Sequence, residues 1–217
     1  MKIPLQNDEE RLSRRERERA RHRREIMEAA IRVFALRGYA QATLDEVSQE
    51  AEFSKGALYL YFSSKEDILF NILFDMSRDI IRFFRETLCG KRSFREELQD
   101  LFLKTAEYSF VDRDRLILLM GQHVAGFTAV SAEGREKLME MHKKFVDTLR
   151  ERTKKAHEDG EIRDLPLEAI SSMVHGSLDG MATTRWYLST VEEATMAVRV
   201  YIEILFQGIA TERKNFA

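Results

Sequence analysis

The sequence predicts an all-α fold, with a small three-helix unit at the N-terminus and a larger helical domain after it. The chain has 217 residues, of which 44% are hydrophobic and 33% are charged, so a core can form beneath a well-solvated surface. Only 2 prolines and 10 glycines interrupt it, which disfavours turn-rich sandwiches and barrels. Apolar residues instead recur at helical spacing between capping signals.

The composition excludes several classes of protein. Cys89 is the only cysteine in the sequence, which excludes an intramolecular disulfide and a multi-cysteine zinc site and suits a reducing compartment. The longest nearly apolar stretch, residues 116–130, contains Gln122 and His123 and is too short to cross a membrane. The first residues lack the apolar segment of a signal peptide. We therefore expect a soluble, cytoplasmic protein without a membrane partner.

Positive charge is concentrated near the N-terminus, although the formal net charge of the chain is −2. Between Arg11 and Arg24 there are eight arginines and two acidic residues, Glu16 and Glu18. Arginine-rich arms beside a folded domain commonly bind phosphates or reach into a minor groove. A solvated helical extension and a disordered tail have the same composition, and the sequence leaves these alternatives open. Residues 1–20 are assigned to this basic arm.

Three short helices are predicted after the arm. Apolar residues at helical spacing indicate the first over 24–37, and Gly38 follows at the position of a C-cap. Thr43 and Glu46 form a capping-box pattern that starts the second helix. After a tight turn, Ser54 caps the third helix, KGALYLYF.

A longer helix follows and leads into the larger domain without an evident flexible linker. Ser64 caps this helix, Glu66 and Asp67 lie favourably in its first turn, and it is expected to end near Gly90. Further helices are expected at about 93–110, 112–129, 132–158, 166–188 and 190–211. Residues 21–70 would form the three-helix domain, and residues 71–217 the larger one.

The capped second and third helices, joined by a tight turn, form a helix-turn-helix pattern. In that motif the second helix enters the major groove of DNA, with its N-terminal residues nearest the bases. The matching residues here offer a hydroxyl, free backbone N–H groups, a positive charge, two small side chains and two tyrosine hydroxyls. They are Ser54, Lys55, Gly56, Ala57, Tyr59 and Tyr61. Leu58 and Phe62, one turn apart, are expected to face the core.

The stretch from Arg24 to Leu69 resembles the DNA-binding domain of the tetracycline-repressor (TetR) family. The motifs that carry the resemblance are A-x-x-x-F-x-x-x-G-Y at 30–39, A-T-L at 42–44, S-K-G-A-L-Y-x-Y-F at 54–62 and S-K-E-D-x-L at 64–69. The resemblance implies that Thr43, Ser54, Lys55, Gly56, Tyr59, Tyr61 and Lys65 contact DNA, mostly its phosphates. Ala57, Arg23 and Arg24 complete the expected DNA-binding set.

Two residues depart from the family pattern. Glu52 stands in the turn where members of the family often have glycine, and a left-handed conformation there would cost about 1 kcal/mol. Asp45 stands where some members carry a basic residue that reads bases. The base specificity therefore does not follow from the resemblance.

The resemblance also implies that the larger domain dimerises through its last two helices. Gly176 and Gly180 lie one turn apart inside a helix, where they and Ser177 would let another helix approach closely. The final helix is apolar on two faces, one with Val198, Tyr201, Leu205 and Ile209, the other with Ile202 and Phe206. One face can serve the core and the other a partner, and burial of both in the core is the alternative.

The same resemblance implies a small-molecule pocket among the middle helices. Candidate lining residues are large or polar: Phe84, Phe102, Tyr108, Met120, His123, Phe127, Met173, His175 and Trp186. Each could equally belong to an ordinary core, and methionine-rich walls would suit an apolar effector. No second ligand stands three or four residues from either histidine, so no metal is expected. Gly-rich phosphate loops and the G-x-S-x-G and H-E-x-x-H motifs are also missing from the sequence, so we expect neither a cofactor nor an enzyme.

These observations favour a homodimeric, sequence-specific transcriptional regulator, expected to be a repressor that a small-molecule effector releases from near-palindromic double-stranded DNA. The alternative is a DNA-binding dimer that is regulated by a protein partner or has no effector. An all-helical enzyme is the remote alternative from another class.

Overall fold

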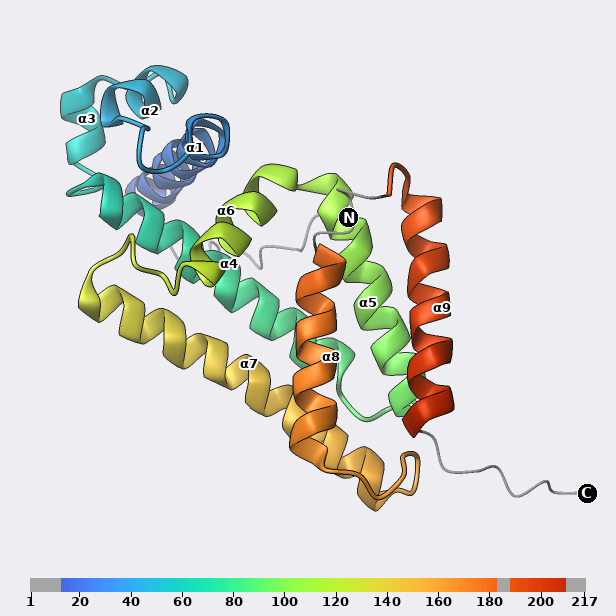
Figure 1. The fold of residues 1–217 in the computed structure, drawn as a ribbon. Helices are drawn as coiled ribbons and strands as arrows, with labels where there is room; N and C mark the ends of the chain where they lie inside the picture. The colour runs from blue at the N-terminus through green and yellow to red at the C-terminus, as the bar shows by residue number, and fades with distance from the viewer. Residues whose placement is uncertain (1–12, 183–187, 210–217) are drawn as a thin grey trace, which may run out of the picture. The chain divides into compact units, whose positions relative to one another are not determined.

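A computed structural model describes residues 13–182 and 188–209 of the chain. Every regular element in these residues is a helix, which confirms the predicted all-α class (Figure 1). The helices are α1 (Arg14–Arg37), α2 (Leu44–Glu50), α3 (Lys55–Tyr59), α4 (Lys65–Thr87), α5 (Phe94–Val111), α6 (Arg113–Val124), α7 (Ala132–Glu158), α8 (Leu167–Ala182) and α9 (Val191–Ile209). In the described ranges, no helix combines the length and the apolar character needed to cross a membrane.

The first helix is longer than predicted, because it begins at Arg14 and not at Arg24. Ser13 is its N-cap: the backbone N–H of Glu16 donates to the Ser13 hydroxyl at 3.4 Å, and the Glu16 carboxylate accepts the N–H of Ser13 at 2.8 Å. The apolar pattern that predicts this helix begins only near Arg24, so it does not indicate the earlier start. The arginine block from Arg14 onward is therefore a helical extension, one of the two alternatives for the basic arm.

Two other helices end earlier than predicted. Helix α3 stops at Tyr59, and α6 stops at Val124 because Gly126 and Phe127 adopt left-handed backbone angles, with φ of 64° and 55°. The N–H of Phe127 donates to the carbonyl of Gln122 at 2.7 Å, which closes this helix end. The predicted end of α8 near 188 cannot be compared in this way, since residues 183–187 lie outside the described part.

The described residues pack as two compact units. Residues 13–79 and 114–140 form the N-terminal unit, and residues 80–113, 141–182 and 188–209 form the C-terminal unit. Helices α4 and α7 each contribute one end to each unit. Helix α6 and the start of α7 pack with the N-terminal unit, although both lie within the expected domain 71–217. The division into domains 21–70 and 71–217 stays a prediction.

The core of the N-terminal unit holds the helix-turn-helix pattern in place. Phe34 of α1, Val47 of α2 and Leu58 of α3 are almost completely buried, as is Phe62 just after α3. This burial confirms that Leu58 and Phe62 face the core. Leu69 and other apolar residues of α4 complete the cluster, so α1, α2 and α3 are fixed to the first half of α4.

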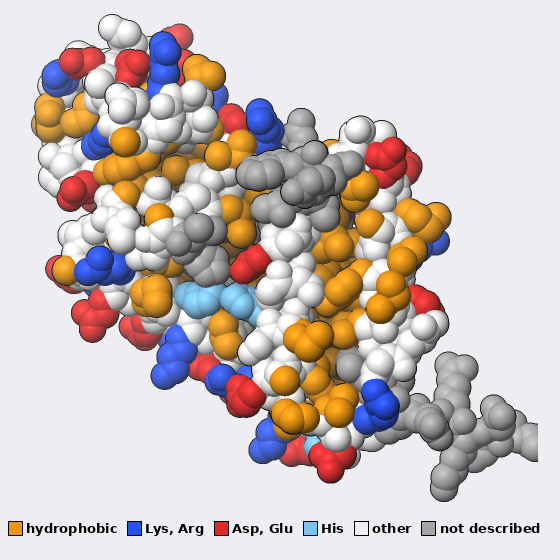
Figure 2. All heavy atoms as spheres, in the orientation of Figure 1, with side chains coloured by type: hydrophobic (Ala, Val, Ile, Leu, Met, Phe, Trp, Pro, Cys, Tyr) orange, Lys and Arg blue, Asp and Glu red, His pale blue; other side chains and the backbone are white. Residues whose placement is uncertain are grey.

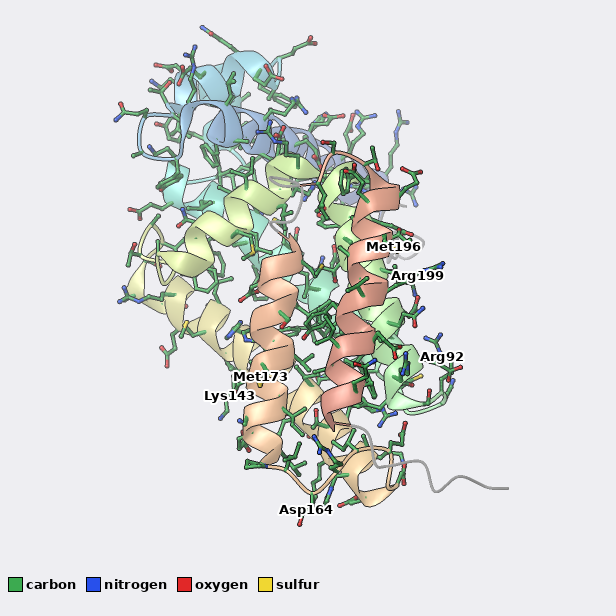
Figure 3. The ribbon with its side chains drawn as sticks, turned by 45° about the vertical axis from the view of Figure 1, so that its right-hand side comes forward. Arg92, Lys143, Asp164, Met173, Met196 and Arg199 are labelled. Atoms are coloured by element: carbon green, nitrogen blue, oxygen red, sulfur yellow. The ribbon has the colours of Figure 1, made fainter. Side chains whose placement is uncertain are left out.

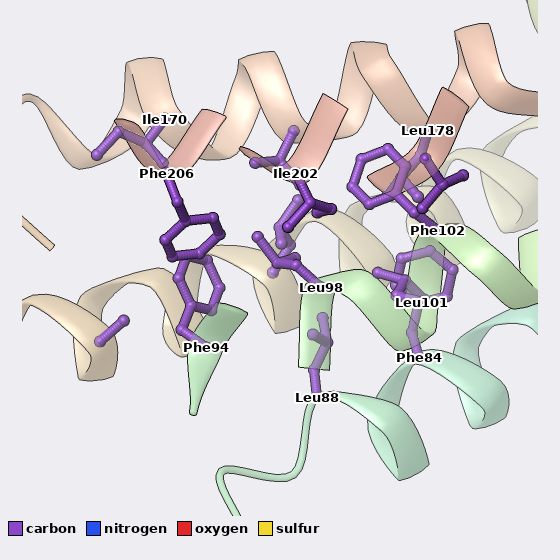
Figure 4. Close-up of a cluster of buried hydrophobic side chains, with 14 of the residues drawn as sticks. Phe84, Leu88, Phe94, Leu98, Leu101, Phe102, Ile170, Leu178, Ile202 and Phe206 are labelled. Carbon is purple, nitrogen blue, oxygen red and sulfur yellow. The ribbon is translucent and has the colours of Figure 1, made fainter. Parts of the chain in front are cut away.

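The core of the C-terminal unit lies among α4, α5, α7, α8 and α9. Helix α5 lies beside both α8 and α9 (Figure 1). Figure 4 shows Phe84, Phe102, Leu178 and Ile202 meeting between these helices, where all four are buried. Each buried side chain of this size stabilises the fold by about 1.5–3 kcal/mol relative to exposure.

Candidate nucleic-acid interface

Helix α2, the turn and α3 form the predicted helix-turn-helix. The Thr43 hydroxyl accepts the N–H of Glu46 at 3.2 Å, and the Ser54 hydroxyl accepts the N–H of Ala57 at 3.2 Å, which confirms both predicted caps. In the turn, Glu52 has a φ of 59°, a left-handed conformation that most residues avoid. The N–H of Phe53 then donates to the carbonyl of Ser48 at 2.9 Å. The turn thus keeps the left-handed geometry without a glycine, at the expected cost of about 1 kcal/mol.

The N-terminal half of α3 is open to solvent. Ser54, Lys55, Gly56 and Tyr59 are exposed, and a Cβ added at Gly56 would meet nothing within 4 Å. Ala57 is half-buried. This part of α3 therefore offers a hydroxyl, a cation, a bare backbone and a phenol on one accessible surface, which is what a phosphate backbone or a groove requires.

Lys55 is paired with Asp45 across the turn. Its ammonium lies 2.8 Å from the Asp45 carboxylate, and both side chains are more than half exposed. The hydrogen bond that Lys55 donates to Asp45 raises the pKa of Lys55, and the charge of Asp45 adds to this effect. A phosphate that binds Lys55 must therefore compete with a carboxylate of the same protein.

Tyr61 has a partner within the N-terminal unit. Its hydroxyl lies 2.8 Å from Nδ1 of His22, and its ring packs edge-on against the rings of His22 and Phe53. The resemblance implied a phosphate contact for this hydroxyl. The structure places it against α1, where it links the extended first helix to the end of the helix-turn-helix.

Arg23 is used inside the unit in a similar way. Its guanidinium donates to the carbonyl of Tyr61 at 2.9 Å and to the side-chain oxygen of Asn71 at 2.7 Å, and it lies 4.4 Å from the centre of the Phe62 ring. These contacts fix α1 to α4, so Arg23 has an internal role, and its contact with DNA stays a prediction. The neighbouring Arg24 is exposed.

Lys65, like Tyr61 and Arg23, is expected to contact DNA but makes internal contacts in the structure. Its ammonium donates to the carbonyl oxygens of Tyr39 and Ala42, both at 2.8 Å, and to that of Ala40 at 3.3 Å. An ammonium has three N–H donors. All of them are used, so Lys65 joins the start of α4 to the loop between α1 and α2.

The helical extension carries a run of positive charge. Arg14, Arg15, Arg17 and Arg19 are all exposed on α1. An α-helix with its side chains is about 10–12 Å wide, whereas the minor groove is about 6 Å wide. The body of the helix can therefore follow phosphates along a duplex but cannot enter the minor groove, and insertion of its arginine side chains there stays a prediction.

The residues expected to line an effector pocket do not converge on one site. Met120, His123 and Phe127 belong to the N-terminal unit, whereas Phe84, Phe102, Tyr108, Met173 and His175 belong to the C-terminal unit. Trp186 and the side chain of His123 lie outside the described part of the chain. Phe84 and Phe102 are buried in the core, the first against Phe145 with ring centroids 4.2 Å apart. These two are core residues, in agreement with the alternative interpretation.

Two of the remaining candidates lie in other surroundings. Met173 is 65% exposed on α8 (Figure 3), which corrects its assignment to a pocket wall. The ring centroid of His175 lies 5.1 Å from that of His142 on α7. The two histidines are far apart in the sequence, so helical spacing does not indicate that they are neighbours. Among the described residues, no group of three or more His, Cys, Asp or Glu side chains could hold a metal ion.

The residues expected at a dimer interface divide into core and surface. Val198 is completely buried and Tyr201 and Leu205 pack against the same core, so the assignment of Val198 to an interface is corrected. Both predicted faces of α9 thus serve the core, and the side chain of Ile209 lies outside the described part. Gly176 and Gly180 are exposed on α8, as the prediction required.

A third face of α9, which the sequence analysis missed, is exposed and apolar. Met196, Val200 and Ile204, spaced four residues apart, are 61%, 51% and 65% exposed. Hydrophobic side chains gather over α8 and α9 in Figure 2, and Figure 3 labels Met196 on this surface. The i, i+4 and i+8 spacing of these three residues indicates this face in the sequence, beside two more strongly apolar faces of the same helix.

Comparisons with known proteins agree with this geometry. Residues 26–72 match the family model described as bacterial regulatory proteins, tetR family. The chain is 26% identical over 187 residues to the fatty acid metabolism regulator protein of Bacillus subtilis (strain 168), covering 85% of this chain and 94% of that protein. It is 25% identical over 192 residues to the HTH-type transcriptional repressor KstR2 of Rhodococcus jostii (strain RHA1), covering 87% and 91%.

Solved structures share the fold. The transcriptional regulator FadR from Bacillus subtilis in complex with stearoyl-CoA matches with a TM-score of 0.71 at 24% identity, covering 85% of this chain and 98% of that one. The ketosteroid transcriptional regulator KstR2 of Mycobacterium tuberculosis matches with a TM-score of 0.71 at 21% identity, covering 88% and 95%.

The helix-turn-helix and the family match lie on the same residues, since 26–72 includes α2, the turn, α3 and the start of α4. The relatives of the chain are transcriptional regulators, and the protein is accordingly a DNA-binding regulator. Residues 26–72 of the chain match the TetR family of bacterial regulatory proteins, and over most of its length the chain is similar to transcriptional regulators.

Proposed function

We propose that the protein is a homodimeric repressor that binds a near-palindromic operator and leaves it when a small molecule binds. The exposed N-terminal half of α3 carries this proposal. Thr43, Ser54, Lys55, Gly56 and Tyr59 would contact the duplex, because they share an accessible surface on one rigid unit. Arginines of the α1 extension would add phosphate contacts and most of the salt dependence.

Dimerisation is supported by the exposed apolar face of α8 and α9. Met173, Met196, Val200 and Ile204 together leave a hydrophobic surface in water, which marks an interaction site more often than a free surface. A Cβ added at Gly176 or Gly180 would meet nothing within 4 Å, so nothing in the described chain requires glycine there. Close approach of a second copy would require it.

The effector is proposed to be apolar in part. The relatives named above include a fatty acid metabolism regulator and a ketosteroid transcriptional regulator, and one solved relative is in complex with stearoyl-CoA. These names support an acyl or polycyclic ligand for this chain. Helix α4 belongs to both units, so a ligand in the C-terminal unit could act on the helix-turn-helix through a shift of α4.

Selection of duplexes from random sequence with the full-length protein tests this function. The proposal expects a near-palindromic consensus with half-site centres about 34–36 Å apart or a multiple of that spacing. Light scattering of the same sample should give the mass of a dimer. Recovery of no consensus above background would contradict the proposed operator, and release by a second protein only would favour regulation by a protein partner.

A further inference from the structure

The C-terminal unit contains a polar cavity that no sequence motif indicated. Its volume is about 470 Å³, within the range of roughly 300–1,000 Å³ that small-molecule sites occupy. The end of α4, the loop that follows it and one face of α7 line this cavity. None of the residues expected to bind an effector is among its lining residues.

Cations outnumber carboxylates in the lining. Arg85 comes from α4, and Lys144, Arg152 and Lys155 come from α7, against the carboxylates of Asp147 and Glu151. Asp147 accepts a hydrogen bond from Arg150 at 2.8 Å, and Lys155 lies 2.9 Å from Asp159. The spacing of the α7 residues places them on one side of that helix.

Arg152 lines the cavity with a guanidinium that is almost completely buried. Its guanidinium is 4% exposed, and its Nε donates to the Glu97 carboxylate at 2.6 Å. Its Nη2 donates to the carbonyl of Arg92 and to the Glu161 carboxylate, both at 3.2 Å. Its Nη1 is buried and has no acceptor within hydrogen-bond distance among the described residues. A buried donor without an acceptor is rare and costs free energy, so it indicates a missing oxygen.

The same network fixes one wall of the cavity. The Glu97 carboxylate also accepts the backbone N–H groups of Lys91 and Arg92, at 3.1 and 3.4 Å, which holds the loop between α4 and α5. Gly90 in this loop has a φ of 70°, and a Cβ there would lie 3.3 Å from Cε of Lys155. The positive φ at Gly90 favours glycine at this position, and the loop lies close to the end of the Lys155 side chain.

We propose that this cavity binds the oxyanion of a small molecule, a phosphoryl or a carboxylate group. Nη1 of Arg152 would donate the directed hydrogen bond, and Arg85 and Lys144 would supply charge. Glu151 would oppose the anion and limit its affinity. Binding at this site does not depend on DNA, but the idea that the oxyanion is the charged end of the effector rests on the proposed function.

Thermal unfolding and calorimetry of the full-length protein test the site with two probes, inorganic phosphate and acetate. Sodium chloride at equal ionic strength controls for screening, and a specific ligand raises the melting temperature above that control. Lys144→Ala and Arg85→Ala should each weaken binding by about three- to tenfold. Glu151→Gln should tighten it by about three- to fivefold, because a like charge is removed. Lys143→Ala, next to Lys144 but outside the lining, is the matched control (Figure 3).

Stabilisation by phosphate alone assigns a phosphoryl ligand, and stabilisation by acetate alone assigns a carboxylate. Arg152→Lys, which keeps the charge and loses the planar fork, should abolish binding if it folds; if it does not fold, the other three variants decide the question. The proposal is overturned if neither probe exceeds chloride, or if these three variants bind like Lys143→Ala. If the probe binds the cavity but does not release the protein from DNA, the anion site stands and only the idea that it holds part of the effector is contradicted.

Discussion

The ammonium of Lys55 lies 2.8 Å from the carboxylate of Asp45, so the first charged residue of the proposed recognition helix is already paired before DNA arrives. Both side chains are exposed, and exposed pairs of this kind contribute little to stability. The effect of Asp45 should therefore be on binding, where its charge repels the phosphates that Lys55 attracts.

Asp45→Asn should raise the affinity for DNA and lower the discrimination between operator and random duplex. The variant frees Lys55 for a phosphate, which all sequences offer, and removes a negative charge from the interface. Fluorescence anisotropy with both duplexes at several salt concentrations measures the change. Equal affinities of the variant and the wild type would show that Asp45 lies away from the duplex.

Lys65→Met should destabilise the N-terminal unit by about 1–3 kcal/mol, because the carbonyls of Tyr39, Ala40 and Ala42 lose a charged donor. Chemical denaturation followed by circular dichroism measures this loss. Lys55→Ala is the matched control, with an expected change within about 0.5 kcal/mol. If the Lys65 variant keeps full stability but loses DNA affinity, the internal role of Lys65 is contradicted and a phosphate contact is supported.

Ile204→Glu should convert the dimer to a monomer. A carboxylate in the middle of the apolar face of α9 would be buried without a partner on association, with a large desolvation penalty. Light scattering at micromolar concentration checks the mass. Leu36→Glu is the control, since it makes the same kind of change at a side chain that is 81% exposed on α1. A dimeric Ile204→Glu variant would place the interface elsewhere.

Replacing Arg14, Arg15, Arg17 and Arg19 with glutamine should weaken DNA binding without unfolding the protein. The four side chains are exposed, and each phosphate that is no longer neutralised lowers the slope of affinity against salt by about 0.9. The slope should fall by up to about 3–4 per protomer while the melting temperature stays near that of the wild type. A large drop in melting temperature would instead give the extension a structural role.

Acid should weaken the cap of α2. The pKa of Glu46 is lowered because its carboxylate accepts the backbone N–H and then the hydroxyl of Thr43. A carboxyl whose folded pKa lies below its unfolded value stabilises the fold above the unfolded pKa, and this contribution disappears as the pH falls through the folded pKa. The difference in stability between wild type and Glu46→Gln should therefore shrink between about pH 6 and pH 3. Glu107→Gln, at an exposed residue outside any cap, should show a smaller change.

Local signals in the sequence predicted most of the fold. The caps at Thr43 and Ser54 and the burial of Leu58 depend on neighbouring residues and on helical period, and the structure confirms them. The start of α1 was not predicted, because arginines on a solvated helix show no apolar periodicity. The capping-box pattern of Ser13 and Glu16 was the signal that indicated this start.

The roles of individual polar side chains were harder to predict, because they depend on partners far along the chain. Arg23 meets Asn71 and Lys65 meets Tyr39 only after folding, so neither internal role could be read from spacing. The same holds for the cavity at Arg152, whose partner Glu97 lies 55 residues away. Composition identifies such side chains as charged, and only the fold decides whether they meet solvent, a ligand or a carbonyl.

The most direct test of the central claim, that the N-terminal half of α3 binds DNA, is the salt dependence of operator affinity for Lys55→Ala. Fluorescence anisotropy on a selected near-palindromic duplex should show weaker binding than the wild type and a slope of log affinity against log salt reduced by about one phosphate contact per protomer. An unchanged affinity and an unchanged slope would contradict the claim and place the DNA surface outside α3.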